Sequence, residues 1–243
     1  MTMANKEVTY QCEGQTLTGY FSWDDTIDNV RPGVILIHEW WGLNDYIRMR
    51  ADQIAELGYC ALAIDMYGDG QTAENPEQAG ELMQSVTDNM SIGTKRLQAG
   101  YQTLVSDPLT DAEKTAAIGY CFGGAMALHM ARTGIPLRSV ATFHAALGSF
   151  HQASPGEITA EILVCHGNAD AMVTQDHVRE FEQEMTELGV TYDIQRYDHV
   201  SHGFTNPEAD ANREKFSVPL AYNQAADASS WIAMQNLLAR TLT

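Results

Sequence analysis

One segment of the sequence has the residue types and spacing of a covalent catalyst. Residues 119–124 read Gly-Tyr-Cys-Phe-Gly-Gly, which is the G-x-S-x-G nucleophile-elbow pattern with Cys121 in the place of serine. In such an elbow a sharp strand-to-helix turn presents the central side chain at a helix N-terminus, where the helix dipole favours a thiolate. The backbone N–H of Phe122 would point to the same place and stabilise an oxyanion. No G-x-S-x-G occurs in the chain. The alternative is that Cys121 is a small buried hydrophobic residue in a glycine-rich turn.

Candidates for an acid and a base follow Cys121 in the order that usually accompanies this elbow, with the acid before the histidine. Asp170 and His202 each come shortly after a predicted strand. His202 would deprotonate the thiol, and Asp170 would orient the imidazole and offset its positive charge. The alternatives are that Asp170 forms an Asx-turn or caps a helix and that His202 is a loop histidine, with His199 as a nearby rival.

A second loop follows the first central strand and reads His38-Glu39-Trp40-Trp41-Gly42. This position usually donates the second N–H of an oxyanion hole, here that of Trp40. Glu39 would be an ionisable group beside the thiol, and the alternative is a solvated loop carboxylate. The histidines of these loops match no standard zinc spacing. We therefore expect neither a metal nor a cofactor.

Composition narrows the class of partner. The 243 residues include 14 Lys and Arg against 32 Asp and Glu, a formal charge of −18, so binding to nucleic acid or to anionic lipid is not expected. The apolar runs are too short to span a bilayer, and no signal peptide is recognisable. The four cysteines show no C-x-x-C spacing, which predicts free thiols in a reducing compartment and hence a cytoplasmic protein.

The segments between the motifs predict the elements that position them. The predicted strands are a hairpin of residues 8–11 and 16–23, followed by residues 33–38, 60–65, 115–119, 139–143, 161–166 and 190–197. The predicted helices are residues 45–57, 76–104 with an interruption near 91–93, 122–132, 174–188 and 207–238, the last in at least one piece. Alternating strands and helices without a break in composition indicate one domain of 243 residues around a mainly parallel sheet covered on both faces. Functional groups gather at the carboxyl ends of such strands.

Taken together, the motifs resemble the dienelactone hydrolase family of α/β-hydrolases. The similar segments span nearly the whole chain and are residues 38–42, 65–68, 119–124, 166–170, 202–204 and 221–231. The resemblance implies an α/β-hydrolase fold with an N-terminal β-hairpin and a triad of Cys121, Asp170 and His202. It implies an oxyanion hole formed by the backbone of Phe122 and Trp40. It also implies that Glu39 contacts the resting thiol and releases it when substrate binds.

One departure from the family concerns the substrate. Members that hydrolyse dienelactones hold the substrate carboxylate with arginines, and one of these positions is Asn206 here. Residues 51–94, 139–178 and 197–212 contain no Lys or Arg, so we expect a neutral small-molecule ester or lactone, or an anion held by backbone N–H groups or a protonated histidine. The expected substrate pocket consists of Trp41, Tyr67, Phe204 and Asn206.

The sequence thus predicts a carboxylic ester hydrolase with a cysteine nucleophile, as a monomer or small homo-oligomer. The rival interpretation is a ligand-binding or oxidant-sensing protein of the same fold, in which Cys121 is a reactive thiol without turnover.

Overall fold

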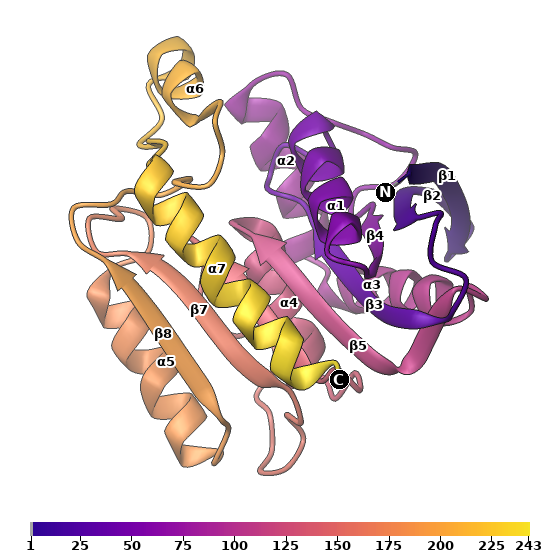
Figure 1. The fold of residues 1–243 in the computed structure, drawn as a ribbon. Coiled ribbons are helices and arrows are strands. Elements are labelled where there is room, and N and C mark those ends of the chain that lie inside the picture. Colours follow the sequence, from indigo (N-terminus) through magenta and orange to yellow (C-terminus); the bar gives the residue numbers. More distant parts are fainter. Residues whose placement is uncertain (1) are drawn as a thin grey trace. The chain divides into compact units, whose positions relative to one another are not determined.

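The computed structural model describes residues 2–243, and within them the chain forms eight strands and seven helices (Figure 1). The strands are β1 (Met3–Cys12), β2 (Gln15–Asp24), β3 (Arg31–Ile37), β4 (Cys60–Ile64), β5 (Thr110–Tyr120), β6 (Ser139–Phe143), β7 (Glu161–Gly167) and β8 (Tyr192–Tyr197). The helices are α1 (Asp45–Glu56), α2 (Pro76–Thr87), α3 (Met90–Val105), α4 (Phe122–Arg132), α5 (Gln175–Glu187), α6 (Ala209–Phe216) and α7 (Gln224–Thr241). The chain divides into two compact units, residues 2–118 with Leu242 and residues 119–241 with Thr243. The single domain expected from the sequence stays a prediction.

The first unit has the strand order β1-β2-β4-β3-β5. Strands β1 and β2 form the predicted hairpin, longer than expected, and its turn residues Glu13 and Gly14 both have positive φ, 51° and 83°. Two such residues make a turn whose twist matches that of the flanking strands. Strands β3 and β4 are parallel and almost wholly buried, which explains their continuous apolar sequence. Helices α1 and α3 pack against these strands.

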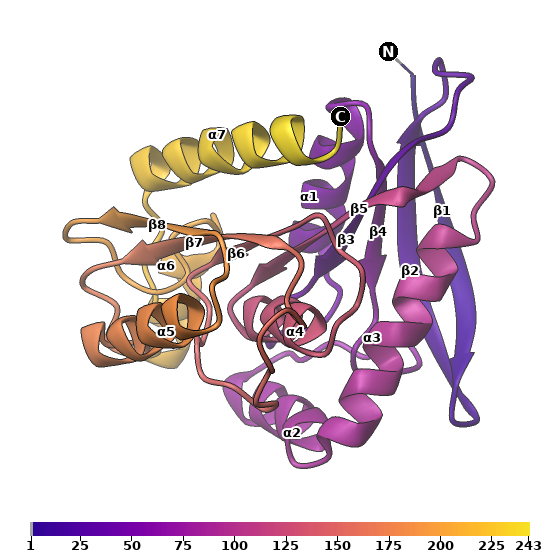
Figure 2. The same ribbon diagram turned by 90° about the horizontal axis from the view of Figure 1, so that it is seen from below.

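The second unit contains the parallel strands β6, β7 and β8, in that order. Figure 2 shows α7 on one face of these strands and α4 and α5 on the other. Helix α5 is amphipathic and buries Val178, Phe181 and Met185 at helical spacing. Loops that leave the carboxyl ends of β6, β7 and β8 belong to this unit, as does α4.

The structure moves one predicted helix interruption and shows that the helical segment predicted over residues 207–238 is in two pieces. The interruption expected near residues 91–93 lies instead at Asp88 and Asn89, where the backbone of Asn89 leaves the helical region with φ −136° and ψ 71°. Residues 207–238 form parts of two helices, because Ser217 adopts a left-handed conformation with φ 57° and ends α6. Helix α4 and strand β6 have the predicted boundaries.

Candidate active site

Cys121 occupies a strained turn between β5 and α4. Its φ of 54° and ψ of −117° lie in a region that residues with a side chain rarely adopt. The N–H of Cys121 donates to the carbonyl oxygen of Phe143 at the end of β6 at 3.0 Å, and the N–H of Gly124 donates to the carbonyl oxygen of Cys121 at 3.0 Å. Cys121 is half-buried, whereas the other three cysteines are buried, and all four are free thiols as expected. The sequence prediction of a nucleophile elbow therefore matches the backbone found here.

Two glycines make this turn sterically feasible. A Cβ atom on Gly119 would lie 2.0 Å from the carbonyl oxygen of Gly123, and one on Gly124 would lie 2.3 Å from the Cβ of Ala145. Both distances are far below van der Waals contact, so neither position accepts alanine without movement of the backbone. Phe122 is the first residue of α4, where backbone N–H groups have no acceptor within the helix. Use of the Phe122 N–H as an oxyanion-hole donor stays a prediction.

The loops that carry Asp170 and His202 are joined through their backbones. The N–H of Asn168 donates to the carbonyl oxygen of Tyr197 at 2.8 Å, and the N–H of Ala169 donates to that of Val200 at 2.9 Å. The approach is close because residue 167 is glycine: a Cβ atom there would lie 2.3 Å from the carbonyl oxygen of Val200. These contacts bring together two side chains 32 residues apart, and Nδ1 of His202 donates to Oδ2 of Asp170 at 2.7 Å.

The electrostatics of the site couple three side chains of the second unit. Burial lowers the pKa of His202, but the charge and hydrogen bonding of Cys121 and Asp170 outweigh burial and raise this pKa to about 10. Nε2 of His202 makes no hydrogen bond of ordinary geometry, so the influence of Cys121 is mainly electrostatic. Burial raises the pKa of Asp170, but the hydrogen bond and charge of His202 and the N–H groups of Val173 and Met172 hold it below the usual range. The negative charges of the Asp170 carboxylate and a Cys121 thiolate both stabilise the His202 imidazolium.

His144 is a residue of this site that the sequence reasoning missed. It is buried directly after β6, with its ring edge-on to that of His202 at a centroid distance of 5.0 Å. Nε2 of His144 shares a hydrogen bond of 2.8 Å with Oγ1 of Thr205. A signal was present in the sequence, because residue 144 directly follows a strand that was predicted with its correct end.

The loop after β3 lies in the first unit and has a defined structure of its own. The ring of His38 is buried, which lowers its pKa, and it donates from Nδ1 to the carbonyl oxygen of Glu39 at 2.6 Å while Nε2 accepts from the N–H of Met66 at 3.2 Å. The Tyr67 hydroxyl donates to the carbonyl oxygen of Trp40 at 2.9 Å. Glu39 and Tyr67 are both buried. The predicted roles of Glu39, Trp40 and Tyr67 toward the thiol and substrate stay predictions.

The remaining pocket candidates are packed within their own units. Trp41 is buried, with its ring 4.9 Å from that of Trp40. Phe204 is fully buried, and Oδ1 of the buried Asn206 accepts from the N–H of Glu208 at 2.9 Å. Their contacts with substrate stay predictions.

Residues 22–242 match the dienelactone hydrolase family, a match that includes every candidate site residue named above. The chain belongs to this family. It is similar to a putative carboxymethylenebutenolidase of Aquifex aeolicus, with 27% identity over 203 residues that cover 82% of this chain and 86% of the relative. It is also similar to the solved structure of P91, a dienelactone hydrolase-like promiscuous phosphotriesterase from metagenomic libraries, with 34% identity, a TM-score of 0.91 and 99% of each chain covered. A structure named m3DLH is 36% identical, with a TM-score of 0.92 and 99% of each chain covered.

Membership of the dienelactone hydrolase family makes the chain a hydrolase with an α/β-hydrolase fold of eight mostly parallel strands, as the resemblance implied. Across residues 2–243, no helix has the length and apolar character needed to cross a membrane. In the same residues, no three His, Cys, Asp or Glu side chains are grouped as metal ligands.

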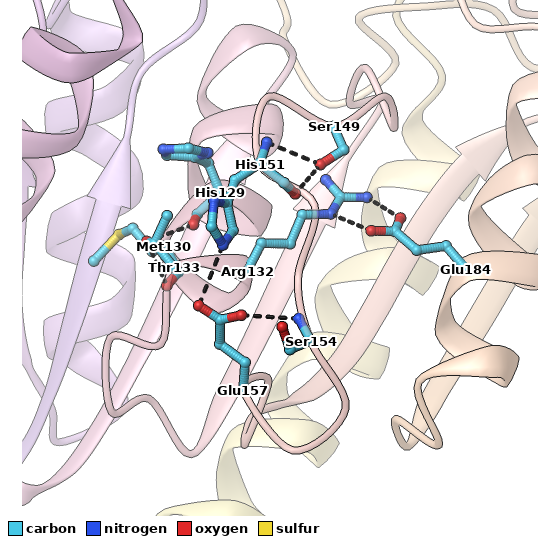
Figure 3. Close-up of polar contacts among 9 residues, drawn as sticks. All are labelled: His129, Met130, Arg132, Thr133, Ser149, His151, Ser154, Glu157 and Glu184. Atoms are coloured by element: carbon cyan, nitrogen blue, oxygen red, sulfur yellow. Dashed lines mark hydrogen bonds and ion pairs between the residues drawn. The ribbon is translucent and has the colours of Figure 1, made fainter.

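In this family member helix α4, which begins directly after Cys121, is anchored at its opposite end. Figure 3 shows Arg132, the last residue of α4, extending toward Glu184 of α5. Nε of Arg132 donates to Oε1 of Glu184 at 2.9 Å, and Nη2 donates to Oε2 of Glu184 and, at 3.0 Å, to the carbonyl oxygen of Leu147. Nη1 donates to the carbonyl oxygen of Gly148 at 3.3 Å. One buried guanidinium thus joins α4, α5 and the loop after β6.

Proposed function

We propose that this member of the dienelactone hydrolase family hydrolyses carboxylic esters or lactones, with Cys121 as nucleophile, His202 as general base and acid, and Asp170 as its partner. The observation that carries the proposal is the 2.7 Å hydrogen bond from Nδ1 of His202 to Oδ2 of Asp170, in a histidine whose pKa the thiol of Cys121 also raises. A histidine stabilised in this way activates a thiol nucleophile by forming an imidazolium–thiolate pair.

The reaction proceeds in two stages. The Cys121 thiolate attacks the carbonyl carbon and forms a C–S bond, while backbone N–H groups of Phe122 and Trp40 stabilise the oxyanion. Collapse of this intermediate breaks the C–O bond, and the His202 imidazolium gives its proton to the leaving alkoxide. His202 then takes a proton from water as the water attacks the thioester. The carboxylic acid leaves, and Cys121 regains its resting form. Asp170 keeps the histidine oriented and balances its charge in both stages.

The proposed substrate is neutral. The segments of residues 51–94, 139–178 and 197–212 contain no Lys or Arg, and the chain has a formal charge of −18. A field of this sign lowers the local concentration of anionic substrates. Asn206 stands where the family's carboxylate-binding arginine would lie, and an amide offers a weaker interaction with a carboxylate than a guanidinium does.

The test is a comparison of neutral aryl esters, neutral lactones and a carboxylate-bearing dienelactone. We expect turnover of the neutral compounds, at least tenfold lower kcat/KM for the dienelactone at low salt, and loss of all turnover in Cys121→Ala. Cys12→Ala is the matched control, because it removes another free thiol outside the proposed triad and should keep the wild-type rate. Equal rates for wild type and Cys121→Ala would contradict the nucleophile assignment. Efficient turnover of the dienelactone would contradict the neutral-substrate assignment alone.

A second candidate activity is hydrolysis of neutral phosphotriesters. It is favoured by the 34% identity over 99% of the chain to P91, a dienelactone hydrolase-like promiscuous phosphotriesterase. An aryl phosphotriester in the same panel tests it, and release of the aryl alcohol beyond one equivalent per Cys121 distinguishes turnover from a single phosphorylation of the thiol. An inert panel combined with rapid peroxide oxidation of Cys121 in both wild type and Asp170→Ala would favour the oxidant-sensing alternative.

The four free thiols support a reducing location, and we therefore propose the cytoplasm, with the 243 residues acting as one catalytic domain. Cleavage by a dilute protease tests the domain assignment: a single protected species is expected, and two separately stable fragments would contradict it.

A further inference from the structure

The loop that carries His202 is held by a buried histidine on the neighbouring strand end. His144 directly follows β6, and its Nε2 shares a 2.8 Å hydrogen bond with Oγ1 of Thr205, three residues after His202. Both His144 and Thr205 are completely buried. We propose that His144 and Thr205 form a positioning pair that fixes the orientation of the His202 imidazole relative to the Cys121 thiol. The inference rests on the proposed function and extends it to two residues outside the triad.

His144 is held by β7 and directly follows the residue of β6 that holds Cys121. Its N–H donates to the carbonyl oxygen of Cys165 in β7 at 2.9 Å, while the carbonyl oxygen of the preceding Phe143 accepts from the N–H of Cys121 at 3.0 Å. The φ of His144 is 41°, a conformation that costs energy for a residue with a side chain and persists only where its surroundings impose it. The backbone at residues 143 and 144 therefore fixes the position of the His144 ring relative to the turn at Cys121.

The His144 ring lies against the loop that carries the base. Its centroid is 5.0 Å from that of His202 at an interplanar angle of 66°, and 5.4 Å from that of Phe204 at 79°. Two hydrogen bonds fix the backbone of this loop. The N–H of Ala221 donates to the carbonyl oxygen of His202 at 3.1 Å, and the N–H of Asn223 donates to the carbonyl oxygen of Phe204 at 3.0 Å. With backbone and ring contacts in place, the hydrogen bond to Thr205 determines how the His144 ring presents its edge to His202.

The hydrogen bond to Asp170 does not by itself fix the orientation of the His202 imidazole. A hydrogen bond at Nδ1 selects the tautomer, but the ring can still tilt about the axis through that bond. An edge-on neighbour limits this tilt and so controls where Nε2 points. A displacement of about 1 Å in a reacting group costs up to about a hundredfold in rate, so a small change in the His144 ring is sufficient to matter.

Thr205→Val tests this positioning role, because valine keeps the shape of the side chain and loses the hydroxyl. We expect kcat for a neutral aryl ester to fall by about tenfold to a hundredfold with KM nearly unchanged. We also expect alkylation of Cys121 by iodoacetamide to need a higher pH, because a misdirected imidazolium stabilises the thiolate less well. Thr205→Ser restores the hydroxyl and should return both readouts to near wild-type values.

Thr241→Val is the matched control, because Thr241 of α7 contacts the opposite end of β6. Oγ1 of Thr241 shares a hydrogen bond of 2.8 Å with Oγ of Ser139, the first residue of β6. This variant should lower the melting temperature without moving kcat or the pH dependence of alkylation. Circular dichroism and melting curves of all variants correct the rates for any loss of folded protein.

The results separate the two proposals. Wild-type kinetics and alkylation in Thr205→Val, or equal defects in Thr205→Ser and Thr205→Val, would overturn the positioning pair while the hydrolase assignment remains. If wild type turns over no ester, the hydrolase assignment fails, and the alkylation profile still decides the pair: a shift in Thr205→Val that is absent in Thr241→Val supports it, and no shift overturns it. Cys121→Ala, which lacks the reporting thiol, provides the alkylation blank.

Discussion

Asp170 and His202 are joined by a 2.7 Å hydrogen bond across 32 residues of sequence, and both side chains are buried. Burial alone would disfavour the charged form of each group. Instead the charge of Cys121 and the hydrogen bond and charge of Asp170 raise the pKa of His202 to about 10. The hydrogen bond and charge of His202, with the N–H groups of Val173 and Met172, hold the pKa of Asp170 below its usual range. The pair is therefore a buried carboxylate and imidazolium near neutral pH, under the electrostatic influence of Cys121.

Asp170→Asn should lower kcat for a neutral aryl ester by about 10³- to 10⁴-fold, the magnitude seen when an aspartate of this kind is replaced. The amide removes the negative charge that raises the pKa of His202, and its NH₂ group favours the wrong tautomer of the ring. The measurement is steady-state kinetics at several pH values. Asp198→Asn is the control, because Asp198 is an exposed carboxylate of the adjacent loop that accepts from Asn168. Similar losses in the two variants would show that the loops, and not the Asp170 charge, determine the rate.

Gly119→Ala should prevent formation of the elbow. Its Cβ atom would lie 2.0 Å from the carbonyl oxygen of Gly123, and because the obstacle is backbone, no side-chain rotation relieves it. We expect a loss of about 3 kcal/mol or more in the free energy of unfolding, or no folded protein. Gly80→Ala is the contrasting variant, in the middle of α2 with no atom within 4 Å of the new Cβ. It should gain about 0.5–1 kcal/mol from helix propensity, measured by urea denaturation. A Gly119→Ala protein as stable as wild type would refute the steric account of the elbow.

The parts of the site that follow local rules were predictable from sequence. Glycines beside Cys121 indicated the strained turn, and φ of 54° was found there. Position after a strand indicated Asp170 and His202, because the carboxyl ends of parallel strands meet at one edge of a sheet. The same rule applies to His144, but its importance depends on a ring contact with His202, and no sequence pattern states which two strand-end side chains will touch.

Long-range polar pairs were outside the reach of sequence reasoning. Arg132 and Glu184 are 52 residues apart, and each reads locally as an ordinary charged residue on a helix. Their pairing follows from the packing of α4 and α5 on one face of the second unit. The apolar periodicity predicts that both segments are helices, but it does not predict which side chains of the two helices meet. The helix boundary at Asp88 and Asn89 was misplaced for a related reason, because a helix ends where its backbone groups find hydrogen-bond partners outside the helix. Residues 91–93 instead lie inside α3.

Arg132→Met should be strongly destabilising although it retains apolar volume. Arg132 is 1% exposed, and its guanidinium donates to Glu184 and to the carbonyl oxygens of Leu147 and Gly148. The variant therefore leaves several acceptors without a donor. Removing one partner of a buried pair costs about 3–5 kcal/mol. Asp176→Asn breaks the exposed pair of Asp176 and Arg179 and should cost less than about 1 kcal/mol. Denaturant midpoints of the two variants give the comparison, and equal costs would contradict the anchoring role of Arg132.

His129 should make stability depend on pH in the mildly acidic range. It is buried in α4, and burial, with smaller effects from the charges of His151 and Arg132, lowers its pKa from 6.5 to about 4 (Figure 3). Between pH 6.5 and pH 4 the unfolded chain binds a proton at this histidine and the folded chain does not. The associated stability is therefore fully present above pH 6.5 and is lost as the pH falls toward 4. The difference of 2.5 pH units corresponds to about 3 kcal/mol.

His129→Leu should flatten this part of the curve of unfolding free energy against pH, measured by urea denaturation, because leucine does not titrate. His199→Asn removes an exposed histidine with positive φ, a conformation that asparagine accepts, and it should retain the wild-type slope. A slope that His129→Leu leaves intact would assign the acid sensitivity to other groups.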